Sequence, residues 1–449
     1  MIVGAAALAL AVGSAPMPDS AGICRQIKDY AQPYISSQNF AGVVVVERRG
    51  RTLCELAAGK AAPGRDQPID FNTRFHIASM SMQFTAAAIL RLVEARKLTL
   101  ETPVSGVISD FPNGSAITIG HLLTQTSGIS DINELPDYDQ VLQHHQTAAT
   151  LVDKVKDLPA RHAPGGSYSR EEHSAYNVLA LIVERRTGLP FSKAVEQLVF
   201  KPLRMRDSGI DDDRPIPGPV ALGNHPVGAT GLEPAEHFLW SGKTGSGSAY
   251  STANDQRRWL RGLFHGDFLS PATRAIMFNL DSRVGYGWFK FNSRRFDTIV
   301  YSMNGRSPGF ASAIVHLPDQ DLSVVVLSNI YSSVTTQLGD DIAAIALGQT
   351  VPQVVLRNTP LTQIQRAEVE GVFHFGPTFY QANADVRVAS QGDDLALHWP
   401  SGDTSILLPL AGDRFMDRSY WVPVSLVRDP GGHVVQLKYD DFLGDRKAR

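Results

Sequence analysis

Apolar and polar residues recur with helical and with strand periodicity along the first part of the chain, and these patterns predict a helix, a strand hairpin and a second helix. Residues 24–38 have the spacing of a helix, and residues 41–60 are typical of two strands joined by a tight Arg-Gly-Arg turn. From residue 79 to residue 95, apolar side chains recur at spacings of three and four, the period of a helix buried on one face. Further helices are expected at residues 174–187, 191–200, 254–264 and 335–347.

The later part of the main region is rich in strand patterns. Residues 284–329 alternate and then run apolar (VGYGWFKF, SAIVHL, LSVVVLS), with Gly, Pro and Asp between the runs. These strands and the early hairpin can form one antiparallel sheet, with helices packed on both of its faces. The expected fold class is therefore α+β.

A second, all-β region is predicted near the end of the chain. Residues 351–362 contain two prolines and no clear periodicity, which indicates a linker. From residue 363 to residue 449, short alternating segments are separated by turns rich in Gly, Asp and Pro, the pattern of a small antiparallel barrel or sandwich. We therefore expect a main domain at residues 23–350 and a small β-barrel at residues 363–449.

Composition narrows the class of protein. The chain has 449 residues, a net charge of −3 and 19% charged residues without a long run of one sign. This balance argues against a nucleic-acid binder, a disordered tail and a polybasic membrane-surface protein. The cysteines lie near no His/Cys cluster with zinc-ligand spacing, so we expect no metal site.

The N-terminal residues and the two cysteines are the features of the sequence that indicate the cellular compartment of the protein. Residues 2–12 are apolar and are followed by small residues and prolines, which is typical of a signal-peptide core too short to span a membrane, although the usual preceding positive charge is missing. We expect residues 1–22 to be a signal peptide and the protein to be periplasmic or secreted. Cys24 and Cys54 are able to form one disulfide in an oxidising compartment, and two unpaired structural thiols are an equally good interpretation.

Several segments of the main domain carry a family resemblance. In chain order they are FHIASMSMQFTAAAIL (residues 75–90), LLTQTSG, SAYNVLALIVERRTG, KPLRMRDSG, AYSTANDQRRWL, GYGWF and GRSPGFASAIVHLPDQDLSVVVLSN. They resemble the serine β-lactamase and penicillin-binding-protein superfamily, and within it the branch of class C β-lactamases, esterases and D-peptidases. The C-terminal region is similar to the lipocalin-like barrel that some members append. Agreement across several ordered segments is more specific than one short motif.

The resemblance implies nucleophilic serine chemistry on an ester, amide or β-lactam, without a metal or an organic cofactor. In that family a serine at the start of a buried helix attacks a carbonyl carbon, and a lysine three residues later helps to remove its proton. A Tyr-x-Asn element supplies a second proton-handling group. A Lys-Thr-Gly or His-x-Gly strand lines the other side, and backbone N–H groups form the oxyanion hole.

Carried over position by position, most of these side chains are replaced. Ser79 stands at the nucleophile position, but the lysine position is Met82, which can neither accept a proton nor carry a charge. The family's LLTHTSG has Gln125 in place of histidine, and the His-x-Gly strand has become Met303-Asn304-Gly305.

The Tyr-x-Asn element admits three alignments. Anchoring on SAYNVLA places Glu171-Glu172-His173 there, and we prefer this alignment because HSAYN differs from a common family form at one position. Anchoring on Pro164-Gly165 gives Arg170-Glu171-Glu172, and the third alignment gives Tyr168-Ser169-Arg170. None of the three preserves both the tyrosine and the asparagine.

A literal Lys-Thr-Gly at residues 243–245 is interpreted as a decoy. The family's strand leads into the last strands and the final helix, as residues 303–348 do, whereas residue 245 leads into the helix at AYSTAND. The oxyanion hole is therefore expected beside the other strand, at the backbone N–H groups of Ser79 and of a residue near Ser307.

Three hypotheses about function follow. In the first, the Ser-Lys-Tyr activity is lost or much reduced, and the cleft at Met82, Gln125 and the Met303-Asn304-Gly305 strand binds a small molecule or peptide. In the second, Ser79 still attacks an ester or amide, with Glu171 or His173 as general base. In the third, the two methionines make the cleft less polar, which suits an apolar ligand or a reaction steered by shape. Ser79 also has a structural interpretation, as a serine that opens a helix.

Overall fold

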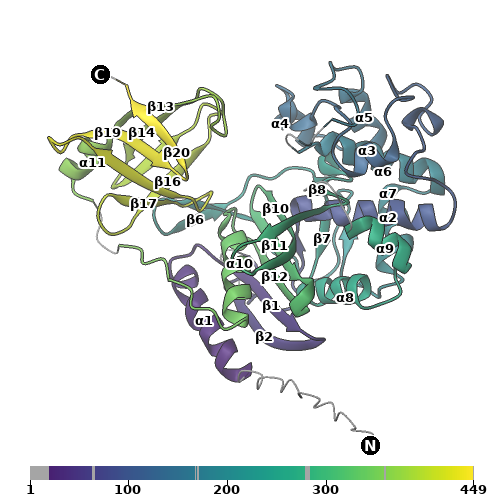
Figure 1. The fold of residues 1–449 in the computed structure, drawn as a ribbon, viewed down its shortest axis with the longest axis horizontal. Helices are drawn as coiled ribbons and strands as arrows, with labels where there is room; N and C mark the ends of the chain where they lie inside the picture. Colours follow the sequence, from purple (N-terminus) through teal and green to yellow (C-terminus); the bar gives the residue numbers. More distant parts are fainter. Residues whose placement is uncertain are drawn as a thin grey trace, which may run out of the picture.

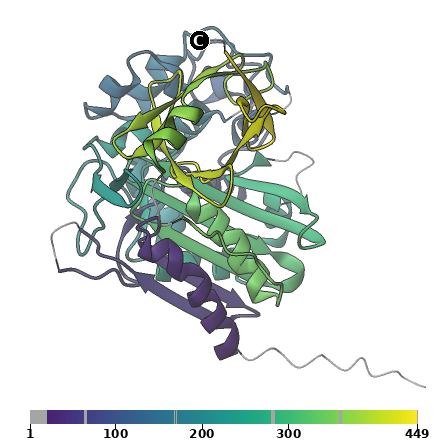
Figure 2. The same cartoon turned by 90° about the vertical axis from the view of Figure 1, so that its left-hand side faces the viewer.

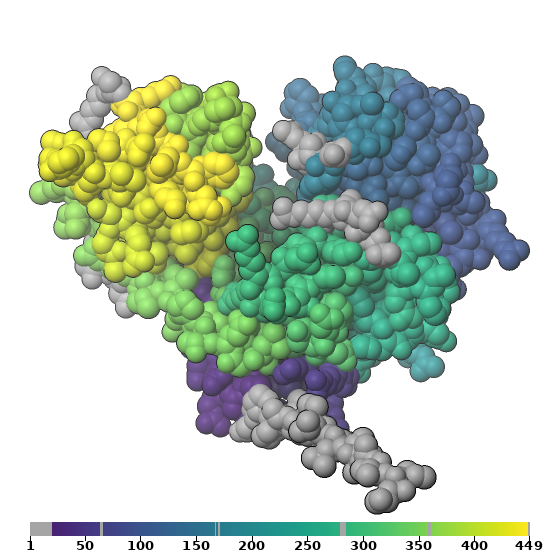
Figure 3. Space-filling model, viewed as in Figure 1, coloured from purple at the N-terminus to yellow at the C-terminus, as the bar shows by residue number. Residues whose placement is uncertain are grey.

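The computed structural model describes residues 20–62, 66–166, 168, 171–278, 284–357 and 361–447. The predicted signal peptide lies outside the described residues except for its last three, which begin the first helix. The chain forms a central sheet with helices on both faces, a lobe of helices beyond one end of the sheet, and a separate β-barrel (Figure 1). The surface is hollowed between the barrel and the lobe of helices (Figure 3).

The central sheet joins the two ends of the main domain. Its strands lie in the order β2-β1-β12-β11-β10-β9-β8 and pair antiparallel. The early hairpin meets the late strands where β1 pairs with β12. Their bounds are β1 Gly42–Arg48, β2 Arg51–Ala58, β8 Val284–Gly285, β9 Trp288–Ser293, β10 Thr298–Ser307, β11 Phe310–Leu317 and β12 Leu322–Ser328. The predicted antiparallel sheet and the α+β class are confirmed.

Helices cover both faces of this sheet. Strand β1 contains four consecutive valines because alternate side chains of a strand point to opposite faces, and here both faces are buried. Val44 and Val46 face the core beneath α1 (Ser20–Ser36) and α10 (Val334–Ala346), while Val43 and Val45 belong to the core shared with α8 (Ala253–Phe264) (Figures 1 and 2).

The predicted helices of the main domain begin within four residues of their expected starts. The helix expected from residue 79 begins as the 3₁₀ turn η1 (Ala78–Ser81) and continues as α2 (Met82–Glu94). The helix expected at residues 191–200 is α7 (Phe191–Val195) followed by a π-helical turn (Glu196–Phe200). The helix expected at residues 174–187 is α6 (His173–Thr187). The described residues of the main domain also contain four α-helices that were not predicted from the sequence: α3 Ile119–Leu123, α4 Tyr138–Leu142, α5 Ala148–Val155 and α9 Pro271–Phe278.

Two small sheets complete the main domain. The first consists of β3 (Phe75–His76), β7 (Ala249–Ser251) and β4 (Gly209–Ile210), with β7 in the centre. It leads the chain into the turn that holds Ser79. The second is the hairpin of β5 (Asn224–Val227) and β6 (Gly231–Pro234), which lies next to the barrel (Figure 1).

The C-terminal region is a closed antiparallel barrel, as predicted. It follows the short helix α11 (Gln363–Val369). Its strands are β13 Gly371–Phe375, β14 Asp385–Gln391, β15 Asp394–His398, β16 Thr404–Pro409, β17 Arg414–Asp417, β18 Pro423–Arg428, β19 Val434–Tyr439 and β20 Phe442–Arg446. Large side chains such as Phe373, Phe379 and Trp399 fill its interior, so the barrel has a packed core.

The turn between β17 and β18 helps to dock the barrel onto the main domain, where barrel side chains such as Ile406 and Met416 also join the core beneath α1 and α10. Arg418, between β17 and β18, is fully buried, and its guanidinium donates to Asn39 Oδ1 at 3.0 Å and to the carbonyl oxygen of Val227 at 2.8 Å. The Arg306 guanidinium of β10 lies 3.9 Å from the ring centre of Tyr331 and 4.3 Å from that of Tyr420. Buried, hydrogen-bonded charges of this kind fix the relative position of the two parts.

Cys24 and Cys54 form a disulfide that ties α1 to β2. Of the two interpretations of the cysteines, the structure therefore has the bonded pair. Among the described residues, no helix combines the length and the apolar character that crossing a membrane requires.

Candidate functional site

Ser79 lies in a strained turn between β3 and α2. Its neighbour Ala78 has φ of +49°, a backbone conformation that residues with a side chain rarely adopt. Ser79 is partly exposed, and its Oγ makes no hydrogen bond to any described residue. The turn thus holds the serine hydroxyl at the surface without using it as a structural donor.

The interpretation of Ser79 as a helix-opening cap does not fit this geometry. The residues that precede η1 and α2 are Ile77 and Ser81, and neither makes a side-chain capping bond. It is Ser81 that carries the structural bonds: its Oγ donates to the Ala78 carbonyl at 2.6 Å and accepts from the Ala249 N–H at 2.9 Å. Capping therefore gives no reason for the serine at position 79.

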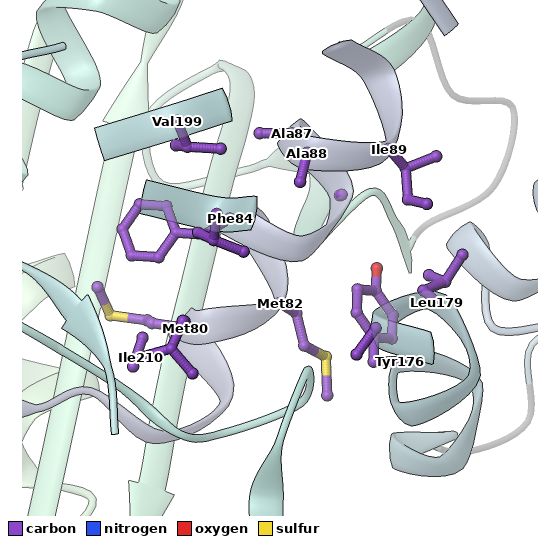
Figure 4. Close-up of a cluster of buried hydrophobic side chains, with 14 of the residues drawn as sticks. Met80, Met82, Phe84, Ala87, Ala88, Ile89, Tyr176, Leu179, Val199 and Ile210 are labelled. Carbon is purple, nitrogen blue, oxygen red and sulfur yellow. The ribbon is translucent and has the colours of Figure 1, made fainter. Parts of the chain in front are cut away.

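Met82, at the lysine position, is buried in the core. It is the first residue of α2, only 1% exposed, and points toward Tyr176 of α6 (Figure 4). Tyr176 does not supply the missing base, because burial raises its pKa and its hydroxyl donates to the Leu123 carbonyl at 3.2 Å. The Met82 Sδ lies 3.9 Å from Nε2 of Gln125, a contact suited to a weak sulfur acceptor.

Gln125 links the nucleophile helix to the start of α6. It is 3% exposed and has φ of +54°. While its Nε2 faces the Met82 sulfur, its Oε1 accepts a hydrogen bond from the backbone N–H of Glu172 at 2.9 Å. Both ends of the amide are thus engaged, and Gln125 bridges the start of α2 and the start of α6.

Glu172 is buried and serves as a structural carboxylate. It is 1% exposed and accepts from Ser127 Oγ at 2.6 Å and from the backbone N–H groups of Ser127 and Gly128 at 3.1 Å. His162 Nε2 lies 3.3 Å from Glu172 Oε1. A buried carboxylate is tolerated when donors surround it in this way, and Glu172 thereby pins the TQTSG loop to α6.

His173 is held as a cation between two carboxylates. Its Nδ1 lies 3.3 Å from Asp131 Oδ2, and its Nε2 lies 3.2 Å from Glu171 Oε2. Burial disfavours the charged imidazolium, but the hydrogen bonds to Asp131 and Glu171 outweigh it and raise the pKa of His173 to about 10. Burial opposes the charge of Glu171 and of Asp131 as well, yet His173 holds the pKa of both carboxyls below the usual value.

Strand β10 brings the third motif against the nucleophile turn. Met303 is 3% exposed and lies in the main core, whereas Asn304 is exposed. Gly305 lies so close to the turn that an added Cβ would be 2.1 Å from the Ile77 carbonyl oxygen and 2.9 Å from the Ser79 nitrogen. Only glycine fits there, which explains its presence without reference to catalysis.

The structure links some of the predicted site residues to one another, but it gives no hydrogen bond between Ser79 and the proposed bases. Met82 and Gln125 contact each other, and Gln125 reaches the Glu171-Glu172-His173 segment through the Glu172 backbone. Neither Glu171 nor His173 forms a hydrogen bond with Ser79 Oγ among the described residues, so their role as bases stays a prediction.

Two of the alternative alignments fall partly on residues that the structure does not describe. Ser169 and Arg170 lie outside the described residues, which leaves the Arg170 and Tyr168 alignments as predictions. The proposed oxyanion-hole donors lie on adjoining elements, because Ser307 closes β10, which packs against η1.

The partners of these residues were not predicted from the sequence. Asp131 and His162, which hold His173 and Glu172, were not picked out. The one signal for them was the dense run of His, Asp and Glu around residues 131–173, which is rare next to a buried helix.

Lys243 of the Lys-Thr-Gly sequence is engaged elsewhere. It ends the 3₁₀ turn η5 (Trp240–Lys243), and its Nζ lies 3.1 Å from Tyr138 Oη. The chain then passes into β7 and α8, as expected for the decoy interpretation. Within the described ranges, His, Cys, Asp and Glu side chains form no group of three arranged to hold a metal ion.

The fold defines a class of protein: an α+β domain built on an antiparallel sheet flanked by helices, with an appended closed barrel. The family model Beta-lactamase matches residues 27–348. This chain belongs to the Beta-lactamase family, and the resemblance stated from its motifs is confirmed.

Curated relatives and a solved structure agree with this assignment. The chain is 29% identical over 308 residues to the putative penicillin-binding protein PbpX of Bacillus subtilis (strain 168), across 67% of this chain and 73% of that one. It is 31% identical over 221 residues to esterase EstB of Burkholderia gladioli, across 44% and 54% of the two chains. The structure of the octameric penicillin-binding protein homologue from Pyrococcus abyssi matches with a TM-score of 0.64 and 20% identity, across 94% and 99%, and shares the fold.

Proposed function

We propose that this protein is a divergent member of the Beta-lactamase family in which the ordinary Ser-Lys-Tyr hydrolysis is lost or much reduced, and in which the cleft binds a small molecule or peptide. One observation carries the proposal. The position three residues after Ser79 is a buried thioether in contact with Gln125, so the amine that would take the proton is replaced by core packing.

The groups around the lysine position support the same conclusion. Tyr176 is a neutral phenol whose O–H already donates a hydrogen bond to the Leu123 carbonyl. His173 has a pKa of about 10 and is therefore protonated at neutral pH. A general base works best with a pKa near the operating pH and in its unprotonated form. At neutral pH the imidazolium of His173 has no lone pair to offer Ser79.

The proposal is tested with a fluorescent penicillin on the full chain. Wild type and Ser79→Ala are expected to show the same low labelling on a denaturing gel after an hour at pH 7. Equilibrium binding of the unreacted compound, measured by fluorescence anisotropy, is expected to be saturable in both proteins. Rapid stoichiometric labelling of wild type that is absent in Ser79→Ala would overturn the proposal.

A second candidate is a working serine esterase or amidase with a rebuilt site, and one observation favours it. The Ser79 hydroxyl is partly exposed and carries no structural bond to a described residue, although a strained turn presents it. EstB, a relative in sequence, is named an esterase. In this candidate Glu171 is the base, because His173 is already protonated.

Nitrophenyl-ester hydrolysis separates the two candidates. The second candidate predicts that Ser79→Ala and Glu171→Gln each lower the rate at least about a hundredfold, the usual size of a lost nucleophile or base. The first predicts equal rates in all three proteins.

The hypothesis of an apolar ligand meets a limit in the structure. Met82 and Met303 are 1% and 3% exposed, so each offers little surface to a ligand. Such a ligand would have to displace them from the core. A hydrophobic dye that binds wild type and the Met82→Gln variant equally would remove this candidate.

We also infer that the mature protein is exported. The support is the apolar leader at residues 2–12 together with the Cys24–Cys54 disulfide, a bond that persists in oxidising compartments. Fractionation of the host cells should place the protein outside the cytoplasm, and deletion of residues 1–22 should retain it inside. An equal distribution of both forms would reject the inference.

A further inference from the structure

A cavity opens in the main domain among residues other than those of the candidate site. Its volume is about 730 Å³, within the range of small-molecule sites. It lies between α7, the π-helical turn that follows it and the β3-β7-β4 sheet. None of Ser79, Met82, Gln125 or Met303 lines it, so it is separate from the candidate site.

The cavity carries more positive than negative groups. Five Lys and Arg side chains line it against three carboxylates, in a chain whose net charge is −3. Asp211 turns away from the cavity, since its Oδ2 lies 2.8 Å from His76 Nε2 and its Oδ1 accepts from the Asp213 N–H. The Asp212 carboxylate accepts hydrogen bonds from Arg214 Nε and from the hydroxyl of Ser192.

The third carboxylate is shared by two lysines because of the π-helical turn. Glu196 Oε2 lies 2.9 Å from Lys193 Nζ, and Glu196 Oε1 lies 3.1 Å from Lys201 Nζ. In an α-helix, residues five apart point in clearly different directions, whereas a wider π turn brings them toward one face. The turn closes with the Lys201 N–H donating to the Glu196 carbonyl at 2.8 Å, and such turns are frequent at functional sites.

The groups left over in the cavity are all hydrogen-bond donors. Arg204 and Arg206 are exposed and have no ion pair within the described part of the chain. The hydroxyl of Tyr250 likewise makes no hydrogen bond to a described residue, and burial raises the pKa of Tyr250, so it remains a neutral donor. The hydroxyl of Ser208 is already directed at Asp255, at 2.8 Å.

The floor of the cavity is held in place by the sheet. Tyr250 pairs with Gly209 on one side and with His76 on the other. An added Cβ at Gly209 would lie 2.4 Å from the Tyr250 hydroxyl, so the glycine leaves room for that group. A donor fixed in this way loses little freedom when it binds a ligand.

We propose that this cavity is a second binding site, for a small polyanion bearing phosphate or carboxylate groups, held by Arg204, Arg206 and Tyr250. Anionic oxygens only accept hydrogen bonds, which matches two guanidinium groups that only donate and a phenol O–H that is able to donate. The guanidinium groups supply charge and paired N–H donors, and the phenol supplies a fixed third contact. This site is independent of whether Ser79 reacts.

Isothermal titration of the full chain tests the proposal with two probes, pyrophosphate and citrate, at constant ionic strength. Saturable binding of one equivalent is expected for at least one probe, and the tighter probe identifies phosphate or carboxylate as the preferred group. The Arg204→Gln/Arg206→Gln double variant should weaken that binding at least about tenfold, and Tyr250→Phe about threefold.

Two control variants make the result specific. Arg96 is exposed and has φ of +57°, close to the +56° of Arg204, but lies outside the cavity, so Arg96→Gln should leave the affinity unchanged. Ser79→Ala should also bind the probe with wild-type affinity. The proposal is overturned if neither probe binds, if Arg96→Gln weakens binding as much as the double variant does, or if Ser79→Ala abolishes it.

Discussion

The nucleophile turn and the segment Glu171-Glu172-His173, which Gln125 links through α2, have diverged in opposite ways. At the turn, Ala78 has a strained backbone conformation, and the Ser79 hydroxyl makes no hydrogen bond to a described residue. The position of the family's proton-accepting lysine is occupied by Met82. In the segment, charged side chains are abundant, yet each is bound to another charge or donor. One region has a nucleophile without an adjacent base, and the other has ionisable groups that are already paired with another charge or donor.

Ionisable residues near a serine therefore do not by themselves make a catalytic site. What matters is whether the group is unprotonated and unoccupied at the working pH. Substitutions in each region test whether the groups there are engaged in the way that their contacts indicate.

Gly305→Ala should destabilise the nucleophile turn strongly. The new Cβ would lie 2.1 Å from the Ile77 carbonyl and 2.8 Å from Ser312 Oγ, and backbone atoms cannot move aside cheaply. We expect a loss of about 3 kcal/mol or more in the free energy of unfolding, measured in urea. Gly106→Ala is the matched control, because its Cβ would make only ordinary contacts of 3.7–3.9 Å. Equal losses in both variants would contradict the claim that the Ile77 carbonyl leaves no space for a Cβ at Gly305.

The adjacent glutamates should respond very differently to the same change. Glu172→Gln removes a buried charge from several donors, and we expect a loss of about 2–3 kcal/mol in urea unfolding. Glu171→Gln should cost less than about 1 kcal/mol, because that side chain is 37% exposed. If the order were reversed, Glu172 would not be the residue that pins the TQTSG loop.

The stability that His173 provides should fall as the pH rises. Its folded-state pKa of about 10 lies above an unfolded value near 6.5, so its contribution is fully present below about pH 6.5 and is lost on passing through about pH 10. We expect wild type to lose about 2 kcal/mol relative to His173→Gln across this window, in urea unfolding at half-unit pH steps. Replacement of the exposed His433 should leave the curve unchanged. A constant difference between wild type and His173→Gln would mean that His173 is not a cation.

Asn304→Ala should have the smallest effect on stability. The side chain is exposed on β10, next to the glycine that tolerates no Cβ. We expect a change within about 0.5 kcal/mol in thermal unfolding. A larger loss would show that Asn304 has a packing role and does not simply line the cleft.

The central sheet, six helices of the main domain and most of the barrel could be predicted from the sequence because periodicity reports burial directly, whereas α3, α4, α5 and α9 were not predicted. The run of valines in β1 and the alternation from residue 369 onward are strong signals. Strands β17 (Arg414–Asp417) and β20 (Phe442–Arg446) were missed because they are short and interrupted by charged residues or glycine. The helix α11 was missed because it is polar on most of its surface.

The candidate site was only partly predictable, for a physical reason. The family motifs identified Met82 and Met303 as replacements, but the fate of a charge depends on partners that are distant in the chain. Glu172 is structural because of Ser127 and Gly128, about 45 residues earlier. His173 is a cation because Asp131 folds back onto it, which no local pattern encodes.

The pH dependence of Ser79 modification shows whether this serine has an activating base. Intact-mass spectrometry gives the rate at which a fluorophosphonate labels wild type, with Ser79→Ala as the blank, between pH 5 and pH 9. Without a side-chain base the rate should follow the fraction of serine alkoxide and rise about tenfold per pH unit, with no plateau. A sigmoidal profile that levels off below pH 8, and that Glu171→Gln abolishes, would mean that Glu171 activates Ser79 and that the hydrolytic machinery has been rebuilt, not lost.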